Sequence, residues 1–90
     1  MSEFEWWEPK RLRVLRERGL DFSDAEMPLA EPRLFTYASP RDGEARWVSV
    51  GYLNGRVVAV VWTRLEETVR IITMRRARRA EERRFGSLYG

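Results

Sequence analysis

The side chains best suited to chemistry in this 90-residue chain are its arginines. Of the 17 basic residues only Lys10 is a lysine, and the chain has no histidine and no cysteine. A guanidinium group is a planar fork that binds two phosphate oxygens at once and stacks on nucleobases. Without histidine and cysteine, the commonest general base and the commonest metal ligands are missing. The composition therefore predicts recognition of an anion by charge, without a metal or another cofactor.

The basic residues are unevenly distributed along the chain. Residues 1–45 carry seven basic and ten acidic side chains, a net charge of −3, whereas residues 46–90 carry ten basic and four acidic ones, a net charge of +6. A high-GC genome would favour arginine codons along the whole chain, but it would not place the excess in the second half. Codon usage alone therefore does not explain the charge pattern.

The length and hydropathy of the chain limit its class. Ninety residues predict a single domain over 1–90. A composition of 43% hydrophobic and 34% charged residues indicates a globular protein. The acidic start lacks the basic-then-apolar order of a signal peptide, and the longest apolar run, Val57–Trp62, is too short to cross a bilayer. We expect a cytoplasmic protein without membrane contact.

The N-terminal third predicts two helices. Phe4–Trp7 is typical of a short strand or an aromatic plug. A helix is then expected between Pro9, which suits a first turn, and Gly19, which suits a C-terminal cap. Ser23–Glu26 has the spacing of a capping box and predicts a second, short helix. Residues 33–44 indicate a weak edge strand followed by a loop.

The second half predicts strands and then a helix. Arg46–Leu53 and Arg56–Arg64 are rich in strand-forming residues and are separated by Asn54-Gly55, the strongest local hairpin signal. Val69–Met74 reads as a third strand. From Ala77 on, helix formers carry opposite charges at i,i+4 spacing. The predicted class is α+β, with two N-terminal helices, an antiparallel meander of three to four strands and a C-terminal helix.

Turn lengths place three side chains together. A two-residue turn at Asn54-Gly55 sets Arg46 opposite Thr63, and a two-residue turn at Glu66-Glu67 sets Thr63 opposite Arg70. These three side chains then share one face of the sheet. Two neighbouring like charges are unfavourable unless an anion lies between them. That anion is either a carboxylate of the protein or a phosphate.

Short motifs along nearly the whole chain resemble one known family. They are Phe4-Glu5-Trp6 with Lys10, Gly19 with Phe22, Ala25 with Glu26, Arg46 with Gly51, the apolar strand Val57–Thr63, and Arg70-Ile71-Ile72-Thr73-Met74-Arg75-Arg76-Ala77 followed by Glu81. In this order they resemble the BrnT family of type II toxins, which share the RelE-like ribonuclease fold. Glu17 and Arg18 stand where the family has lysine and histidine.

The resemblance implies an RNA-cleaving toxin. It would be neutralised by a DNA-binding antitoxin of the ribbon-helix-helix type, reach DNA only through that antitoxin, and act on RNA with or without the ribosome. Metal-free RNA cleavage moves a 2′-hydroxyl onto the adjacent phosphate, and arginines stabilise the charge that develops there.

Site residues follow from this chemistry. Arg46, Arg70, Arg75 and Arg76 are expected to stabilise the phosphoryl group, and Glu81 to accept a proton, with Glu44 and then Tyr89 as the other candidates. The expected RNA-binding residues are Lys10, Arg18, Arg78 and Arg79. Simpler roles stay open for several residues. Glu81 is also suited to a plain ion pair, the arginines of the C-terminal helix to a solvated face, and Trp47 and Trp62 to the core or an antitoxin interface rather than to base stacking.

Three functions are compatible with the sequence. The first is an active ribonuclease toxin. The second is a catalytically weak or inactive relative that binds its antitoxin as a co-repressor. The third is a non-catalytic RNA-binding or protein-binding module of the same fold.

Overall fold

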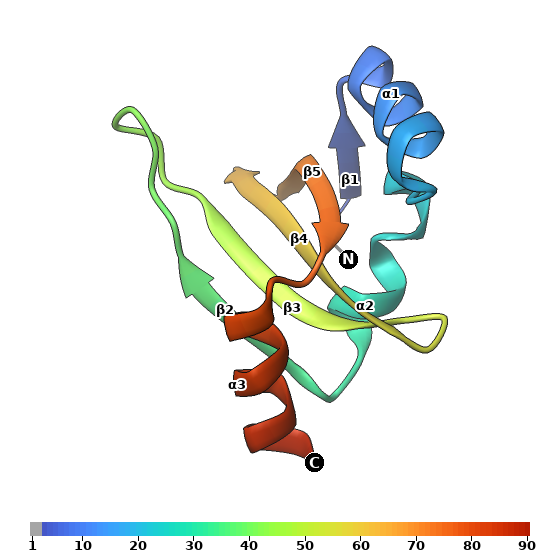
Figure 1. Ribbon diagram of the computed structural model, residues 1–90. Coiled ribbons are helices and arrows are strands. Elements are labelled where there is room, and N and C mark those ends of the chain that lie inside the picture. Colours follow the sequence, from blue (N-terminus) through green and yellow to red (C-terminus); the bar gives the residue numbers. More distant parts are fainter. Residues whose placement is uncertain (1–2) are drawn as a thin grey trace.

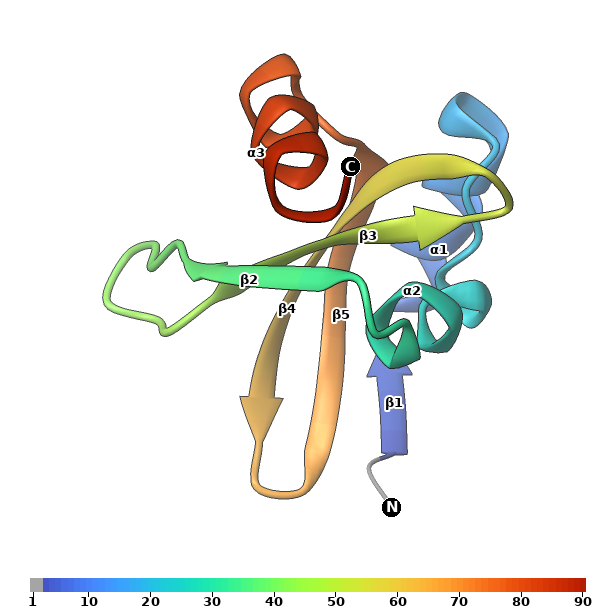
Figure 2. The ribbon, with the colours of Figure 1, turned by 90° about the horizontal axis from the view of Figure 1, so that it is seen from below.

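A computed structural model describes residues 3–90 as a five-stranded sheet with helices on both faces. In chain order the elements are β1 (Glu3–Trp6), α1 (Glu8–Arg18), the 3-10 turn η1 (Phe22–Asp24), α2 (Glu26–Ala30), β2 (Leu34–Ala38), β3 (Trp47–Leu53), β4 (Arg56–Leu65), β5 (Thr68–Arg76) and α3 (Arg79–Tyr89). Figures 1 and 2 show α1 and α2 on one side of the sheet and α3 on the other.

The sheet is mixed, with the strand order β1-β5-β4-β3-β2. Strands β2, β3, β4 and β5 pair with one another in antiparallel fashion, whereas β1 runs parallel to β5 and sets Phe4 opposite Val69. The α+β class is confirmed. The short strand offered for Phe4–Trp7 is present as β1. The predicted order of two helices followed by three to four purely antiparallel strands is wrong, because β1 precedes the helices and joins the sheet edge parallel to β5. This pairing joins opposite ends of the chain, so local sequence patterns carry no signal for it.

The two predicted turns have the expected length. Asn54 and Gly55 both adopt positive φ angles, 51° and 79°, as a type I′ turn requires, and Leu53 pairs with Arg56. A two-residue turn also joins β4 to β5, since Leu65 pairs with Thr68.

The N-terminal helices follow the sequence in part. Pro9 lies in the first turn of α1, and Gly19 ends the helix with a φ of 70°. The capping box expected at Ser23 is wrong. Instead the Asp21 carboxylate caps η1 by accepting the Ser23 backbone N–H at 2.9 Å, and Arg11 holds the same carboxylate at 3.0 Å. A longer-range ion pair thus selects Asp21 as the cap, and the second helix is reduced to η1 and the five-residue α2.

Each face of the sheet has its own hydrophobic core. The core on the α1 face consists of Val14, Leu20, Phe22, Ala25, Leu53, Val58, Val60, Val69, Ile71 and Met74. The core on the α3 face consists of Phe35, Val48, Val50, Ala59, Ala77 and Phe85. Successive residues of β4 contribute to opposite cores, which explains the unbroken apolar run of this strand.

An irregularity in β5 changes which side chains share a face. Val61 pairs with Thr73 and Trp62 pairs with Ile71, so Ile72 is an extra residue in β5. Without this bulge, Arg70 and Arg75 would point to opposite faces, because they are five residues apart. With it, both lie on the α3 face.

Candidate functional site

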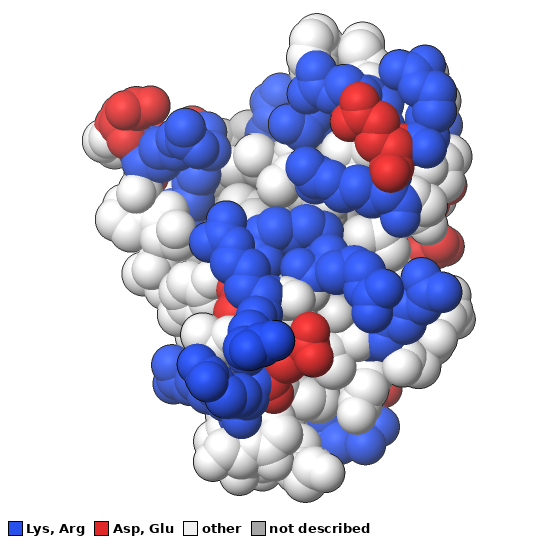
Figure 3. Space-filling view, viewed as in Figure 1, with Lys and Arg blue, Asp and Glu red and all other residues white. Residues whose placement is uncertain are grey.

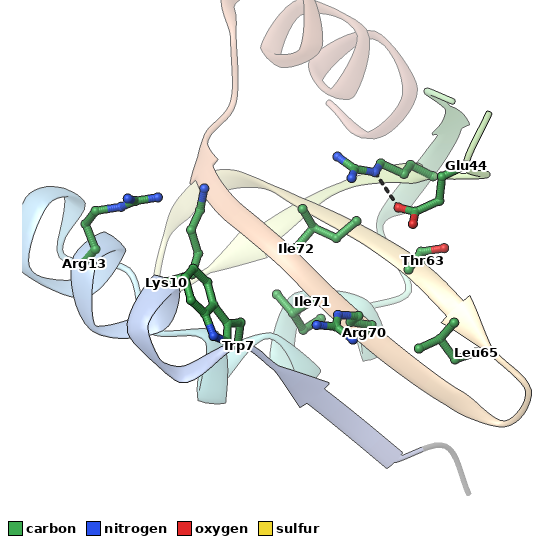
Figure 4. Close-up of a pocket in the computed structure, with 10 residues that line it drawn as sticks. Trp7, Lys10, Arg13, Glu44, Thr63, Leu65, Arg70, Ile71 and Ile72 are labelled. Carbon is green, nitrogen blue, oxygen red and sulfur yellow. Dashed lines mark hydrogen bonds and ion pairs between the residues drawn. The ribbon is translucent and has the colours of Figure 1, made fainter. Parts of the chain in front are cut away.

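Two adjoining hollows lie on the α3 face of the sheet. The first, of about 420 Å³, is lined by Trp7, Lys10, Arg13, Glu44, Arg46, Thr63, Leu65, Arg70, Ile71 and Ile72 (Figure 4). The second, of about 390 Å³, is lined by Lys10, Arg18, Tyr37, Ser39, Pro40, Arg41, Arg46, Val48, Val61, Ile72, Thr73, Arg75 and Arg78. Because they share Lys10, Arg46 and Ile72, we treat them as one basic groove.

The groove is strongly cationic. Its lining includes eight basic residues, namely Lys10, Arg13, Arg18, Arg41, Arg46, Arg70, Arg75 and Arg78, and one acidic residue, Glu44. Figure 3 shows basic side chains gathered over the surface between α1 and α3. Helix α1 forms one wall and the loop between β2 and β3 contributes to the other, so cations from distant parts of the chain meet over the sheet.

Most of the residues expected from the sequence meet in this groove. They are Lys10, Arg18, Arg46, Arg70, Arg75 and Arg78. Arg76 and Arg79 are exposed residues that do not line it. Arg76 pairs with Val58, a residue of the opposite core, so its side chain leaves the sheet on the other face from Arg75.

Sequence reasoning missed Arg13, Arg41, Tyr37 and Trp7. A signal existed for Arg13, which lies three residues after Lys10 and so on the same side of α1. Arg41 lies in an irregular loop, and no periodic pattern places it.

In the first hollow, Arg46 and Arg70 have different partners. The Arg46 Nε donates to Glu44 Oε1 at 2.8 Å. The nearest carboxylate to Arg70 is Glu5, with Nη1 and Oε1 3.9 Å apart, and both side chains are about half exposed. The sequence left a carboxylate or a phosphate open as the anion at these two cations. In the structure each arginine has a different carboxylate near it, Glu44 for Arg46 and Glu5 for Arg70. Arg70 keeps its hydrogen-bonding capacity for a ligand.

In the second hollow, Arg75 is held by a buried carboxylate. Its two terminal nitrogens donate to both oxygens of Glu81, at 2.7 and 3.0 Å. The Arg78 backbone N–H donates to Glu81 at 2.8 Å, and the Tyr37 hydroxyl also donates to it. Glu81 lies in the first turn of α3 and is only 7% exposed. The bidentate pair therefore fixes the plane of the Arg75 guanidinium at the groove.

Hydrogen bonds in this network shift the pKa of Glu81, and burial in the groove shifts the pKa of Lys10. Burial alone would raise the pKa of Glu81, but the hydrogen bonds from Arg75, Tyr37 and the Arg78 backbone outweigh it and lower this pKa to about 2. Glu81 is therefore ionised at neutral pH. Burial, followed by the charges of Arg13 and Arg18, lowers the pKa of Lys10. Burial is thus the main cause of the Lys10 shift, and the two neighbouring arginines add to it.

Glu81 should make stability depend on acid pH. Its pKa of about 2 in the fold lies below the ordinary value of 4.5, so its contribution is present above about pH 4.5 and disappears as the pH falls toward 2. Between these limits we expect wild type to lose about 1–3 kcal/mol more unfolding free energy than Glu81→Gln. Urea unfolding at a series of pH values measures this difference, and parallel curves for the two proteins would contradict it.

Arg18 connects α1 to the bulge in β5. Its Nη1 donates to the Met74 carbonyl at 2.7 Å and to the Thr73 hydroxyl at 3.1 Å. We expect Arg18→Ala to lower the unfolding free energy by about 1 kcal/mol, because the bulge loses a charged donor. The matched control is Arg16→Ala, which removes an exposed arginine of the same helix. Equal unfolding midpoints for the two variants in urea would show that Arg18 has no structural role.

Trp47 and Trp62 do not line the groove. Their rings stack on each other with centroids 5.0 Å apart, and the Trp62 indole N–H donates to the Ser49 hydroxyl at 2.8 Å. Trp62 packs against the core on the α1 face, opposite the groove. The geometry thus favours the core or interface interpretation of this pair over base stacking at the arginines.

Two further observations concern residues 3–90. In that range no three acidic side chains are grouped so that they could hold a metal ion. None of the helices described there is long and apolar enough to cross a membrane.

The fold is thus a five-stranded mixed sheet with helices on both faces and a strongly cationic groove on one of them. Residues 6–81 match the model of a family described as the ribonuclease toxin BrnT of type II toxin-antitoxin systems. This match covers most of the chain, and the protein therefore belongs to the BrnT family. A toxin of a type II system has an antitoxin partner. Comparison with curated protein sequences gives no significant match.

Proposed function

We propose that this protein is a metal-independent endoribonuclease toxin that cleaves RNA in the basic groove. The observation that carries the proposal is the convergence of eight basic side chains and a single carboxylate on one continuous hollow. Such a groove neutralises successive phosphates, and its arginines match phosphate geometry with paired hydrogen bonds.

The reaction would be an internal transfer at phosphorus. The 2′-oxygen of one nucleotide attacks the adjacent phosphorus and the bond to the 5′-oxygen breaks. The proton of the 2′-hydroxyl passes to an acceptor, and the leaving 5′-oxygen takes up a proton. Negative charge accumulates on the phosphoryl oxygens in the transition state, and fixed guanidinium groups stabilise it. Arg70 and Arg75 suit this role because one is free to bind and the other is held rigidly.

The carboxylates would have separate roles. Glu81 positions Arg75 and stays ionised, since three donors hold it. Glu44 is the carboxylate that lines the groove, which makes it the better placed proton acceptor of the two. Tyr89 donates its hydroxyl to the Leu34 carbonyl and does not line the groove.

The partner would be a ribbon-helix-helix antitoxin that connects the toxin to operator DNA. The family supports an antitoxin of some type. In this proposal the toxin itself contacts RNA, with or without the ribosome, and contacts DNA only through the antitoxin in a cytoplasmic complex.

Expression in cells tests the proposal. Induction of the protein alone should arrest growth with decay of RNA, and coexpression of the antitoxin should restore growth. The purified protein should cleave RNA in the presence of a chelator. Normal growth together with intact RNA, from a protein that is folded by circular dichroism, would contradict the proposal.

One observation favours a second candidate, a catalytically weak relative that binds RNA and its antitoxin as a co-repressor. Two carboxylates that contact groove arginines are engaged by them, Glu44 by Arg46 and Glu81 by Arg75, so neither of these two is free to accept a proton. This candidate predicts salt-dependent RNA binding without cleavage. Measuring the binding and the cleavage of the same RNA distinguishes the active toxin from the catalytically weak relative.

A further inference from the structure

Trp7 is exposed, although it lines the first hollow of the basic groove. Its side chain is 62% exposed. The other tryptophans are packed, since Trp6 meets Phe22 edge to face and Trp47 stacks on Trp62. Within residues 3–90 the Trp7 ring has no aromatic partner of its own. Its flat surface is therefore available to a ligand.

The position of Trp7 between β1 and α1 explains this exposure. The residue continues the extended backbone of β1, with φ −86° and ψ 115°. Its side chain therefore lies on the same face of the sheet as Glu5 and on the opposite face from Trp6. Glu5 pairs with Arg70 in the β1–β5 ladder, so this face is the one that carries the groove. The Trp7 carbonyl accepts the Lys10 backbone N–H at 3.0 Å, which fixes the residue at the start of α1.

The surroundings of the ring match those of a nucleotide site. Figure 4 shows Trp7 beside the Lys10 side chain, with Arg13 on the same helix and Arg70 on the adjacent β5. A single exposed aromatic residue is ordinary on a protein surface. An exposed indole in a hollow lined by four cations is different, because cations bind phosphates while an aromatic ring stacks on the neighbouring base.

We propose that Trp7 forms a base-stacking subsite of the groove. One nucleobase of the RNA lies on the indole ring, and Lys10 and Arg70 hold the phosphate next to it. The nucleotide at this position must be unpaired, because the faces of bases inside a double helix are covered by their neighbours. This inference rests on the proposed RNA-binding function and adds a contact to the base itself.

Two short 2′-O-methyl oligonucleotides with the same number of phosphates test the subsite. One carries adenine at every position and the other is abasic, and neither has the hydroxyl that attacks phosphorus. Wild type should bind the adenine oligomer roughly 5- to 100-fold more tightly than the abasic one. Trp7→Ala should lose this preference but keep its affinity for the abasic oligomer and the salt dependence of that affinity. Trp7→Phe should keep part of the preference.

Tryptophan fluorescence provides a second measurement. Stacking of adenine should quench part of the emission of wild type. The same oligomer should leave the emission of Trp7→Phe unchanged, although this variant still binds it. Trp47 and Trp62 lie on the opposite face of the sheet and should not respond.

The control is Leu12→Ala, which removes a side chain that is 50% exposed on the same helix and does not line the groove. It should leave both affinities unchanged. The subsite is wrong if Trp7→Ala keeps the preference for adenine, loses affinity for both oligomers equally, or weakens only antitoxin binding. If wild type binds neither oligomer, the proposed RNA-binding function itself fails.

Discussion

Arg75→Ala is expected to lower both the stability of the protein and its RNA cleavage. The substitution leaves the Glu81 carboxylate, which is 7% exposed, without its bidentate partner. Removing one member of a buried ion pair costs about 3–5 kcal/mol, a large part of the total stability of a small domain. Loss of the guanidinium at the groove should also slow cleavage at least ~tenfold, or about 1.4 kcal/mol in the barrier. Urea unfolding and single-turnover cleavage measure the two effects.

A double variant separates these effects. In Arg75→Ala combined with Glu81→Gln, the buried group is neutral, so most of the lost stability should return. Cleavage should stay low because the guanidinium is still missing. If the double variant recovers both stability and activity, Arg75 has only a structural role.

Arg70→Ala is expected to reduce cleavage at least ~tenfold while leaving the fold intact. The Arg70 side chain is about half exposed, and its nearest carboxylate oxygen is 3.9 Å away. Its removal should therefore change the unfolding free energy by less than about 0.5 kcal/mol. RNA binding weakens as salt is added, and the logarithm of the binding constant falls linearly with the logarithm of the salt concentration. Loss of one phosphate contact should make this slope shallower by about one. Cleavage assays and binding at several salt concentrations provide the measurements.

Two further variants control for charge and for geometry. Arg79→Ala removes the same charge from a residue outside the groove and should retain nearly full activity. Arg70→Lys keeps the charge but loses the planar fork, so it should recover only part of the rate. Unchanged cleavage in both Arg70→Ala and Arg75→Ala would show that the reaction takes place elsewhere on the protein.

The groove combines one loosely paired arginine and one that is held by two hydrogen bonds. Arg70 is free to adjust to an incoming phosphate, whereas Arg75 is held by Glu81 and by the start of α3. The bulge at Ile72 brings both onto the same face. An insertion or deletion of one residue between them in β5 would separate them, since the side-chain period of a strand is two.

Part of this arrangement was predictable from the sequence because it depends on local structure. The Asn54-Gly55 turn has a conformation that few other residue pairs adopt, and its length determines the β3–β4 register. Counting outward from this turn and the next one predicted that Arg46, Thr63 and Arg70 would lie side by side, and all three line the first hollow. The helix ends at Pro9 and Gly19 were predictable for the same reason.

Only the tertiary structure decided the rest. The parallel pairing of β1 with β5, which brings Trp7 to the groove, depends on hydrogen bonds between opposite ends of the chain. The bulge at Ile72 interrupts the side-chain alternation of β5, so Arg75 lies on the same face as Arg70 although the two are five residues apart. Glu81 meets Arg75 because α3 packs on the sheet beside it. Sequence patterns report the conformations of neighbouring residues, whereas contacts between distant ones form only when both cores are packed.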